Sequence, residues 1–183
     1  MPLNHTSKYA ELTDAQFILI GKLTIEFSNV EFLLSEILSR LLITPSFLSR
    51  TYTDRMNVNA IIEKIKNAID IHSRRYGFSI VPADVCESIS DIVAEIGKIR
   101  LIRNKFAHYC WCRDDDNKIF GTGFSSSHAK HQKPDEDCLL ITNPEIEEMY
   151  LTSYKIVDRL EGILMRLPEL LEDKDLKSKL RYK

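Results

Sequence analysis

Hydrophobic residues recur every three or four positions along four long stretches of the chain, which is the spacing of an amphipathic helix. In the first stretch the apolar stripe runs from Phe17 to Leu41, and Pro45 ends it because proline cannot continue a helix. The third stretch begins after Pro82, a residue suited to the first turn of a helix. We therefore predict helices over about 13–44, 57–75, 83–108 and 143–167, with residues 46–56 as an irregular connection.

Residues with short polar side chains stand at several predicted helix starts, where they can accept hydrogen bonds from free backbone N–H groups. These candidate caps are Thr13-Asp14 for the first helix, Asn57 or Asn59 for the second, and Thr142 or Asn143 for the last. Gly77 follows two arginines at the end of the second helix, which is the usual order of a helix stop.

The pattern changes between the third and the last helix. Residues 109–112 and 118–124 favour strands on either side of a polar turn, which predicts a hairpin, and 138–141 predicts a short third strand. The polar residues 125–137 between them predict a loop. The fold class is therefore mainly α: a four-to-five-helix bundle with a small β-hairpin and loop insertion between the third and last long helices.

The predicted domain organisation follows from these elements. Residues 1–12 form a loose N-terminal lead-in, residues 13–167 form a single helical bundle with the insertion at about 109–141, and residues 168–183 form a charged C-terminal tail. With 183 residues the chain is long enough for one domain with a substantial core.

Composition narrows the functional classes. A net charge of −2 provides no general attraction for nucleic acid, so any anion-binding surface must be local. Apolar runs of about four residues are too short to span a membrane. The polar first 13 residues lack the apolar core of a signal peptide, so we expect a cytoplasmic protein whose four cysteines are free thiols.

One segment is strongly basic although the chain as a whole has a net negative charge. Lys98, Arg100, Arg103 and Lys105 place four cations within eight residues, with no acid among them, near the end of the third predicted helix. Cations in this position are favoured by the helix macrodipole, so a solvated basic face is one explanation. The same cations can contact RNA phosphates, and the neighbouring Tyr109 can stack on a base, although packing is the more common fate of such a ring.

The polar residues of this segment have a defined helical arrangement. Arg100, Asn104 and His108 are spaced i, i+4, i+8 and share one face. Arg103 and His108 diverge by about 140° around a regular helix. They converge only if the helix frays after residue 107 or if a second copy of the chain supplies the partner group. Arginine suits phosphate oxygens and histidine can move a proton near neutral pH.

The segment Arg103-Asn104-x-x-x-His108 resembles the Arg-x4–6-His motif of the HEPN superfamily, which has a polar residue after the arginine. Members are helical bundles, and many are ribonucleases of toxin–antitoxin, anti-phage or CRISPR-associated systems. The resemblance covers residues 13–167 by element order and six residues by motif.

The resemblance implies a homodimer in which two such motifs meet and cleave RNA without a metal or other cofactor. His108 would be the general acid or base at a ribose 2′-hydroxyl, Arg103 would stabilise the phosphorane, and Asn104 would orient either His108 or the phosphate. The products would be a 2′,3′-cyclic phosphate and a 5′-hydroxyl. Lys98, Arg100, Lys105 and Tyr109 would bind RNA, and an antitoxin or other regulatory protein would be a further partner.

Two alternatives stay open at this point. The superfamily also contains members without nuclease activity, so a catalytically inactive helical dimer that binds a protein or a nucleotide is the second function. Some toxin members carry tyrosine two residues after the histidine, whereas this chain has Cys110 there, so regulation by tyrosine modification is not expected.

A zinc site is the alternative for the nearby cysteines. Cys110 and Cys112 would share one side of a strand, and His108, His128, His131 and Cys138 are further ligand types. The Cys-x-Cys step differs from the Cys-x2–4-Cys spacing of structural zinc sites, so we expect thiols without metal.

Overall fold

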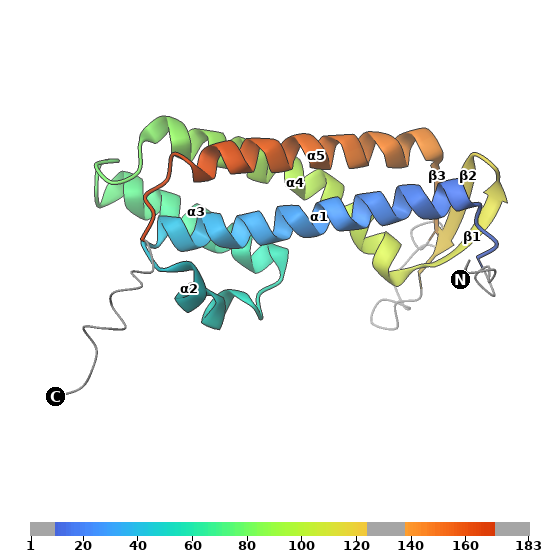
Figure 1. Ribbon diagram of the computed structural model, residues 1–183, viewed down its shortest axis with the longest axis horizontal. Coiled ribbons are helices and arrows are strands. Elements are labelled where there is room, and N and C mark those ends of the chain that lie inside the picture. The colour runs from blue at the N-terminus through green and yellow to red at the C-terminus, as the bar shows by residue number, and fades with distance from the viewer. Residues whose placement is uncertain (1–9, 124–137, 171–183) are drawn as a thin grey trace. The chain divides into compact units, whose positions relative to one another are not determined.

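The computed structural model describes residues 10–123 and 138–170 (Figure 1). Within these ranges lie α1 (Asp14–Leu41), α2 (Ser46–Thr53), α3 (Val58–Arg74), α4 (Ala83–His108), β1 (Cys110–Asp115), β2 (Lys118–Thr122), β3 (Cys138–Thr142) and α5 (Asn143–Leu164). The mainly α-helical fold class, with a small β insertion between the third and last long helices, is confirmed. Residues 1–9 of the predicted lead-in, the predicted loop over 125–137 and residues 171–183 of the tail lie outside the described residues.

The helix α2 replaces the irregular connection expected over 46–56. With eight residues it is too short to show a hydrophobic period of its own. Among the described residues, no helix combines the length and hydrophobicity needed to cross a bilayer.

The chain divides into two compact units, and α1, α4 and α5 each contribute residues to both. The first unit contains residues up to 29 together with 95–156, and the second contains 30–94 together with residues from 157 onward.

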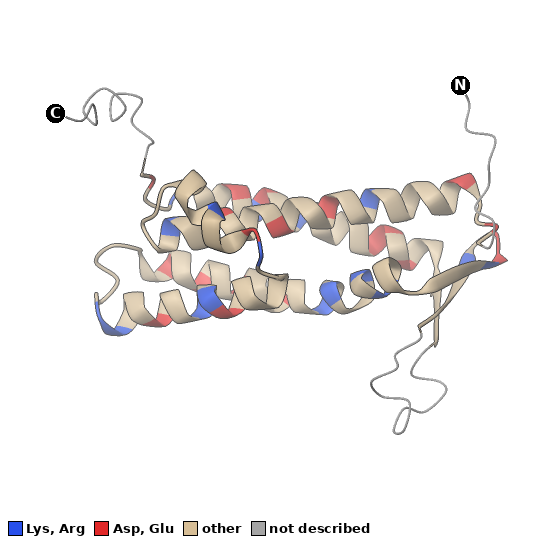
Figure 2. Cartoon of the chain, turned by 90° about the horizontal axis from the view of Figure 1, so that it is seen from below, with Lys and Arg blue, Asp and Glu red and all other residues tan. Residues whose placement is uncertain are grey.

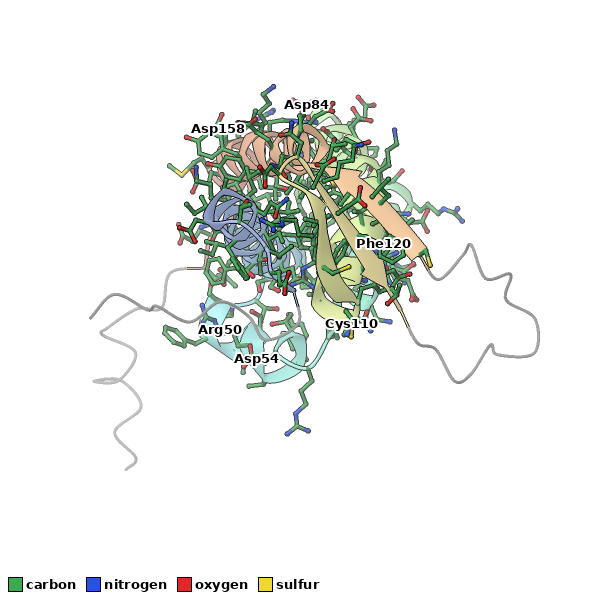
Figure 3. The ribbon with its side chains drawn as sticks, turned by 90° about the vertical axis from the view of Figure 1, so that its right-hand side faces the viewer. Arg50, Asp54, Asp84, Cys110, Phe120 and Asp158 are labelled. Carbon is green, nitrogen blue, oxygen red and sulfur yellow. The ribbon has the colours of Figure 1, made fainter. Side chains whose placement is uncertain are left out.

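The first unit contains an antiparallel sheet of order β1-β2-β3. Cys112 pairs with Phe120, which pairs in turn with Leu140, so these three positions share one face of the sheet. Figure 3 shows the three strands side by side, with Phe120 labelled. The opposite face buries Ile119 and Ile141. The hairpin and third strand expected from the sequence are therefore present, with their apolar side chains alternating as the pleat requires.

Capping explains where two helices of the first unit begin. The Thr13 N–H donates to Oε1 of Gln16 at 2.9 Å, and the Gln16 N–H donates to Oγ1 of Thr13 at 3.3 Å. Thr142 and Glu145 repeat this reciprocal capping box at the start of α5. Because the carboxylate accepts the N–H and O–H of Thr142, the pKa of Glu145 is lowered.

Local sequence features also explain where α3 of the second unit begins and ends. Asn57 caps α3 by accepting the Ala60 N–H at 3.0 Å, which decides between the two asparagines proposed for this role. Gly77 has φ +52°, a left-handed conformation that suits glycine after a helix. Buried apolar residues line its core on α1, α3, α4 and α5, including Leu34, Ile37, Ile65, Ile89 and Leu160.

Two residues of the predicted apolar stripes are exposed. Phe17 of α1 is 42% exposed and Tyr154 of α5 is 57% exposed. Helical spacing identifies which side chains share a stripe but does not show how wide the buried part of that stripe is.

Candidate functional site

The basic end of α4 is a regular helix as far as its last residue, His108. The Tyr109 N–H still donates to the Lys105 carbonyl at 2.9 Å, which continues the helical hydrogen-bond pattern past Ala107. The helix therefore does not fray after this residue. Arg103 and His108 remain on faces about 140° apart, so they do not converge by local unwinding.

Arg103 is held on α4 by a neighbouring helix of the same unit. Its guanidinium carbon lies 5.1 Å from the ring centroid of Phe27 on α1, a cation–π distance. Its Nη1 donates to Oδ1 of Asn104 at 3.4 Å. Phe27 is fully buried and Arg103 half-buried, so the ring provides a fixed apolar support for the planar cation.

Asn104 is thereby linked to Arg103, and among the described residues it has no hydrogen bond to His108. The imidazole of His108 is exposed at the end of α4. The structure thus brings Arg103 and Asn104 together and leaves His108 apart from them. Arg100, Asn104 and His108 share one face, as expected for an uninterrupted helix.

The remaining cations follow one another on the end of α4 that leads into β1 (Figure 2). Lys98 is exposed, and Arg100 is half-buried with its Nε shielded from solvent and without a hydrogen-bond partner in the described structure. Lys105 places Nζ 5.4 Å from the ring centroid of Tyr109. These cations and this ring therefore gather along three turns of helix and the residue after it.

The two aromatic residues after α4 pack against the sheet. Trp111 stacks on Phe106 with ring centroids 4.7 Å apart and donates its indole N–H to the Phe106 carbonyl at 3.3 Å. A Cβ on Gly121 would lie 2.7 Å from the Trp111 ring. Trp111 is therefore a packing residue.

Tyr109 is packed in a similar way. A Cβ on Gly123 would overlap its ring, so the tyrosine covers this glycine closely. Lys105 also contacts the ring. A base that stacked on Tyr109 would have to use the part of the ring that these neighbours leave uncovered.

Sequence reasoning missed the role of Phe27, which it placed in the core stripe of the first helix. Nothing in the spacing of the chain links this residue to Arg103, because their contact depends on how two helices pack. A signal did exist for the aromatic packing. Tyr109 and Trp111, two residues apart, face Gly123 and Gly121 across the hairpin, and aromatic rings commonly cover strand glycines in this way.

No group of three or more His, Cys, Asp or Glu side chains within residues 10–123 and 138–170 is placed to hold a metal ion. Cys110, Cys112 and Cys138 are exposed free thiols. Two histidines of the zinc alternative, His128 and His131, lie outside the described residues.

Comparison of the chain with protein-family models, with curated proteins and with solved structures finds no match.

Proposed function

We propose that this chain is a metal-independent endoribonuclease of the HEPN type that acts in the cytoplasm, in a toxin or anti-phage role. In this proposal two copies form a dimer with two composite sites, and in each site Arg103 of one copy works with His108 of the other. The observation that carries the proposal is the continuity of α4 through His108. Because one helix holds these side chains about 140° apart, a joint site needs a second copy.

The proposed chemistry uses side chains alone. His108 removes the proton from a ribose 2′-hydroxyl, the 2′-oxygen attacks phosphorus, and the bond from phosphorus to the 5′-oxygen breaks. A protonated histidine returns a proton to the leaving 5′-oxygen, which gives a 2′,3′-cyclic phosphate and a 5′-hydroxyl. Arg103 stabilises the charge on the phosphorane.

The neighbouring residues have supporting roles in this mechanism. Asn104 fixes the guanidinium of Arg103 through their shared hydrogen bond at 3.4 Å. Lys98, Arg100 and Lys105 contact phosphates on either side of the cleaved bond. The uncovered part of Tyr109 contacts a base.

A second candidate function is a catalytically inactive helical dimer that binds a protein or a nucleotide. The observation that favours it is the packing of Arg103 over Phe27, which gives the arginine a structural use without any reaction. Under this alternative an antitoxin or other regulatory protein would be a binding partner only.

The test is RNA cleavage in EDTA by the wild type and by Arg103→Ala and His108→Ala. We expect each substitution to lower the rate by at least about 100-fold and the product to end in a cyclic phosphate. Arg55→Ala is the matched control because it removes an exposed arginine from the second unit. Cleavage that survives both site substitutions would refute the mechanism, and a wild type inactive on varied RNAs would favour the binding module.

Co-expression of the two inactive variants tests the shared site. About half of randomly formed dimers are mixed, and each mixed dimer has one intact Arg103–His108 pair, so about a quarter of the wild-type activity should return. If each site takes both residues from one chain, no activity returns, and the composite site is wrong while the nuclease proposal stands.

A further inference from the structure

A cavity of about 700 Å³ lies in the second unit, lined by residues of α1 and of the C-terminal end of α5. Its volume is in the range of pockets that bind drug-sized ligands. Leu33 of α1 and Leu164 of α5 are buried apolar residues of the lining, whereas Met165 is 86% exposed. An exposed methionine beside buried leucines is typical of surfaces that bind other proteins.

The charged side chains of the lining give the cavity a negative character. Its cation, Arg40, already has partners, because Nη1 donates to the Leu164 carbonyl at 2.7 Å and Nη2 lies 3.2 Å from Oε1 of Glu169. Asp158 and Glu161 are exposed carboxylates in the lining, and neither side chain has a partner within residues 10–123 and 138–170. The charge that the cavity offers to a ligand is therefore that of these two carboxylates.

The two carboxylates are placed to act on one cation. Asp158 and Glu161 are three residues apart on α5, so they share one face of the helix with Cβ atoms about 5–6 Å apart. A guanidinium has five N–H donors in a planar fork and can bond to both carboxylates. The aliphatic stem of the same arginine can pack on apolar surface, which the lining also provides.

Gly162 provides an independent observation. Glycine is unfavourable within a helix because it loses more backbone freedom on folding than any other residue. A Cβ on Gly162 would meet nothing within 4 Å beyond its own stretch of helix, so packing inside the described chain does not require glycine here. Gly162 lines the cavity beside Glu161, and the missing side chain lets another chain approach α5 closely.

We propose that this cavity binds an arginine-bearing segment of a partner protein. The guanidinium lies between Asp158 and Glu161, its stem lies over Gly162, and a neighbouring apolar side chain of the segment contacts Met165. The charge of the cavity selects the class of partner, because an acidic segment would bring like charges together. The proposal uses none of the residues assigned to RNA cleavage and stands independently of it.

The test uses the peptide acetyl-Ser-Leu-Ala-Arg-Ala-Leu-Ser-amide and its twin with citrulline, which keeps the shape of arginine without the charge. Each peptide is titrated into the full ¹⁵N-labelled chain, and the shifts of the amide resonances give both the site and the affinity. We expect the arginine peptide to shift resonances of residues 158–165 and to bind about three- to tenfold more tightly than its twin. Equal affinities, or no shifts at these residues, would overturn the proposal.

A double variant tests the two charges. Asp158→Asn with Glu161→Gln removes both charges at nearly constant shape, so the arginine peptide should bind no more tightly than the citrulline peptide. The matched control, Glu147→Gln with Glu148→Gln, changes two exposed carboxylates of α5 in the first unit and should leave the preference intact. Equal effects of the two double variants would contradict a site at Asp158 and Glu161.

A second variant fills the cavity and leaves its charge unchanged. Because leucine favours a helix and a Cβ is accommodated, Gly162→Leu should not lower the Tm but should weaken binding of both peptides at least about tenfold. Gly21→Leu makes the same change at a glycine of the first unit with equally open surroundings and should leave binding unchanged. Full binding by Gly162→Leu would refute the site.

The chain itself contains an alternative occupant, since residues 177–183 carry four cations and no acid. Replacing these four side chains with glutamine keeps the chain at full length. We expect the arginine peptide to bind this variant as it binds the wild type. Binding that is at least about threefold tighter would show that the tail competes for the cavity, and a separate partner would then not be its occupant.

Discussion

Gln16 joins the start of α1 to the β1–β2 turn through one buried amide. Its side chain is fully buried, and Oε1 accepts the Thr13 N–H at 2.9 Å. Its Nε2 donates to the carbonyls of Asp115 and Lys118 at 2.9 and 3.3 Å. We expect Gln16→Met, which keeps the length and much of the volume of the side chain, to remove all three hydrogen bonds.

The size of the effect follows from these contacts. Each hydrogen bond contributes about 0.5–1.5 kcal/mol net, so three contribute about 2–4 kcal/mol to the free energy of unfolding. Gln16→Glu separates the two halves of the amide, because it keeps an oxygen for Thr13 and loses the donor to both carbonyls. A carboxylate facing two carbonyl oxygens is unfavourable, so Gln16→Glu should destabilise at least as much as Gln16→Met.

Urea unfolding gives the free energy, and amide hydrogen exchange in β1 and β2 shows whether the turn is affected locally. The control is Asn67→Ala, which changes an exposed amide in the middle of α3 and should shift stability by less than about 0.5 kcal/mol. If Gln16→Met also costs less than about 0.5 kcal/mol, the bridging amide does not stabilise the fold and the reasoning is refuted.

Three further predictions follow from local features. Burial, together with the charges of Asp84 and Glu87, raises the pKa of Cys86. A thiol reagent should therefore modify Cys86 only on unfolding, and should quickly modify the exposed thiols of Cys110, Cys112 and Cys138. Equal rates of modification at all four cysteines would contradict this prediction. Thr142→Ala removes the hydroxyl of the α5 capping box, which donates to the Glu145 carboxylate and accepts the Glu145 N–H, and should cost about 0.5–2 kcal/mol near pH 7 in urea unfolding. Together with the backbone N–H of Thr142, the bond from its hydroxyl to the carboxylate lowers the pKa of Glu145. This part of the cost is therefore present above the ordinary carboxyl pKa and should fade as the pH drops through the lowered value; a cost independent of pH would exclude the carboxylate. Gly121→Ala would place a Cβ 2.7 Å from the ring of Trp111. It should lower the free energy of unfolding by about 1–3 kcal/mol and change the fluorescence emission of this single tryptophan. Unchanged emission and stability would show that the ring can move away.

The sequence was most informative where the determining interactions are local. Thr13, Asn57 and Thr142 were identified as candidate caps because a cap bonds to an N–H two or three residues away, and the structure contains all three caps. Strand-favouring residues on either side of a polar turn likewise predicted the hairpin. Contacts between distant elements could not be predicted. No pattern in α1 indicates that Gln16 would form hydrogen bonds with the β1–β2 turn or that Phe27 would lie under Arg103.

At the candidate site, too, local features could be predicted from the sequence and contacts between elements could not. The face shared by Arg100, Asn104 and His108 follows from helical spacing, and α4 is regular as expected. The surroundings of these side chains could not be predicted from the motif, because Arg103 packs against another helix and the ring of Tyr109 lies over Gly123 across the hairpin.

The contact between Arg103 and Phe27 decides how loss of activity in an arginine variant should be interpreted. A cation over an aromatic ring contributes about 0.5–2 kcal/mol to stability, so Arg103→Ala would lower both stability and cleavage even if the guanidinium never touched RNA. Arg103→Lys keeps a positive charge near the ring but loses the planar fork that binds phosphate at two points. If Arg103 acts on the phosphorane, the lysine variant keeps most of the stability and loses most of the cleavage. If Arg103 only packs, cleavage follows stability in both variants, so the two quantities together separate the catalytic role from the structural one.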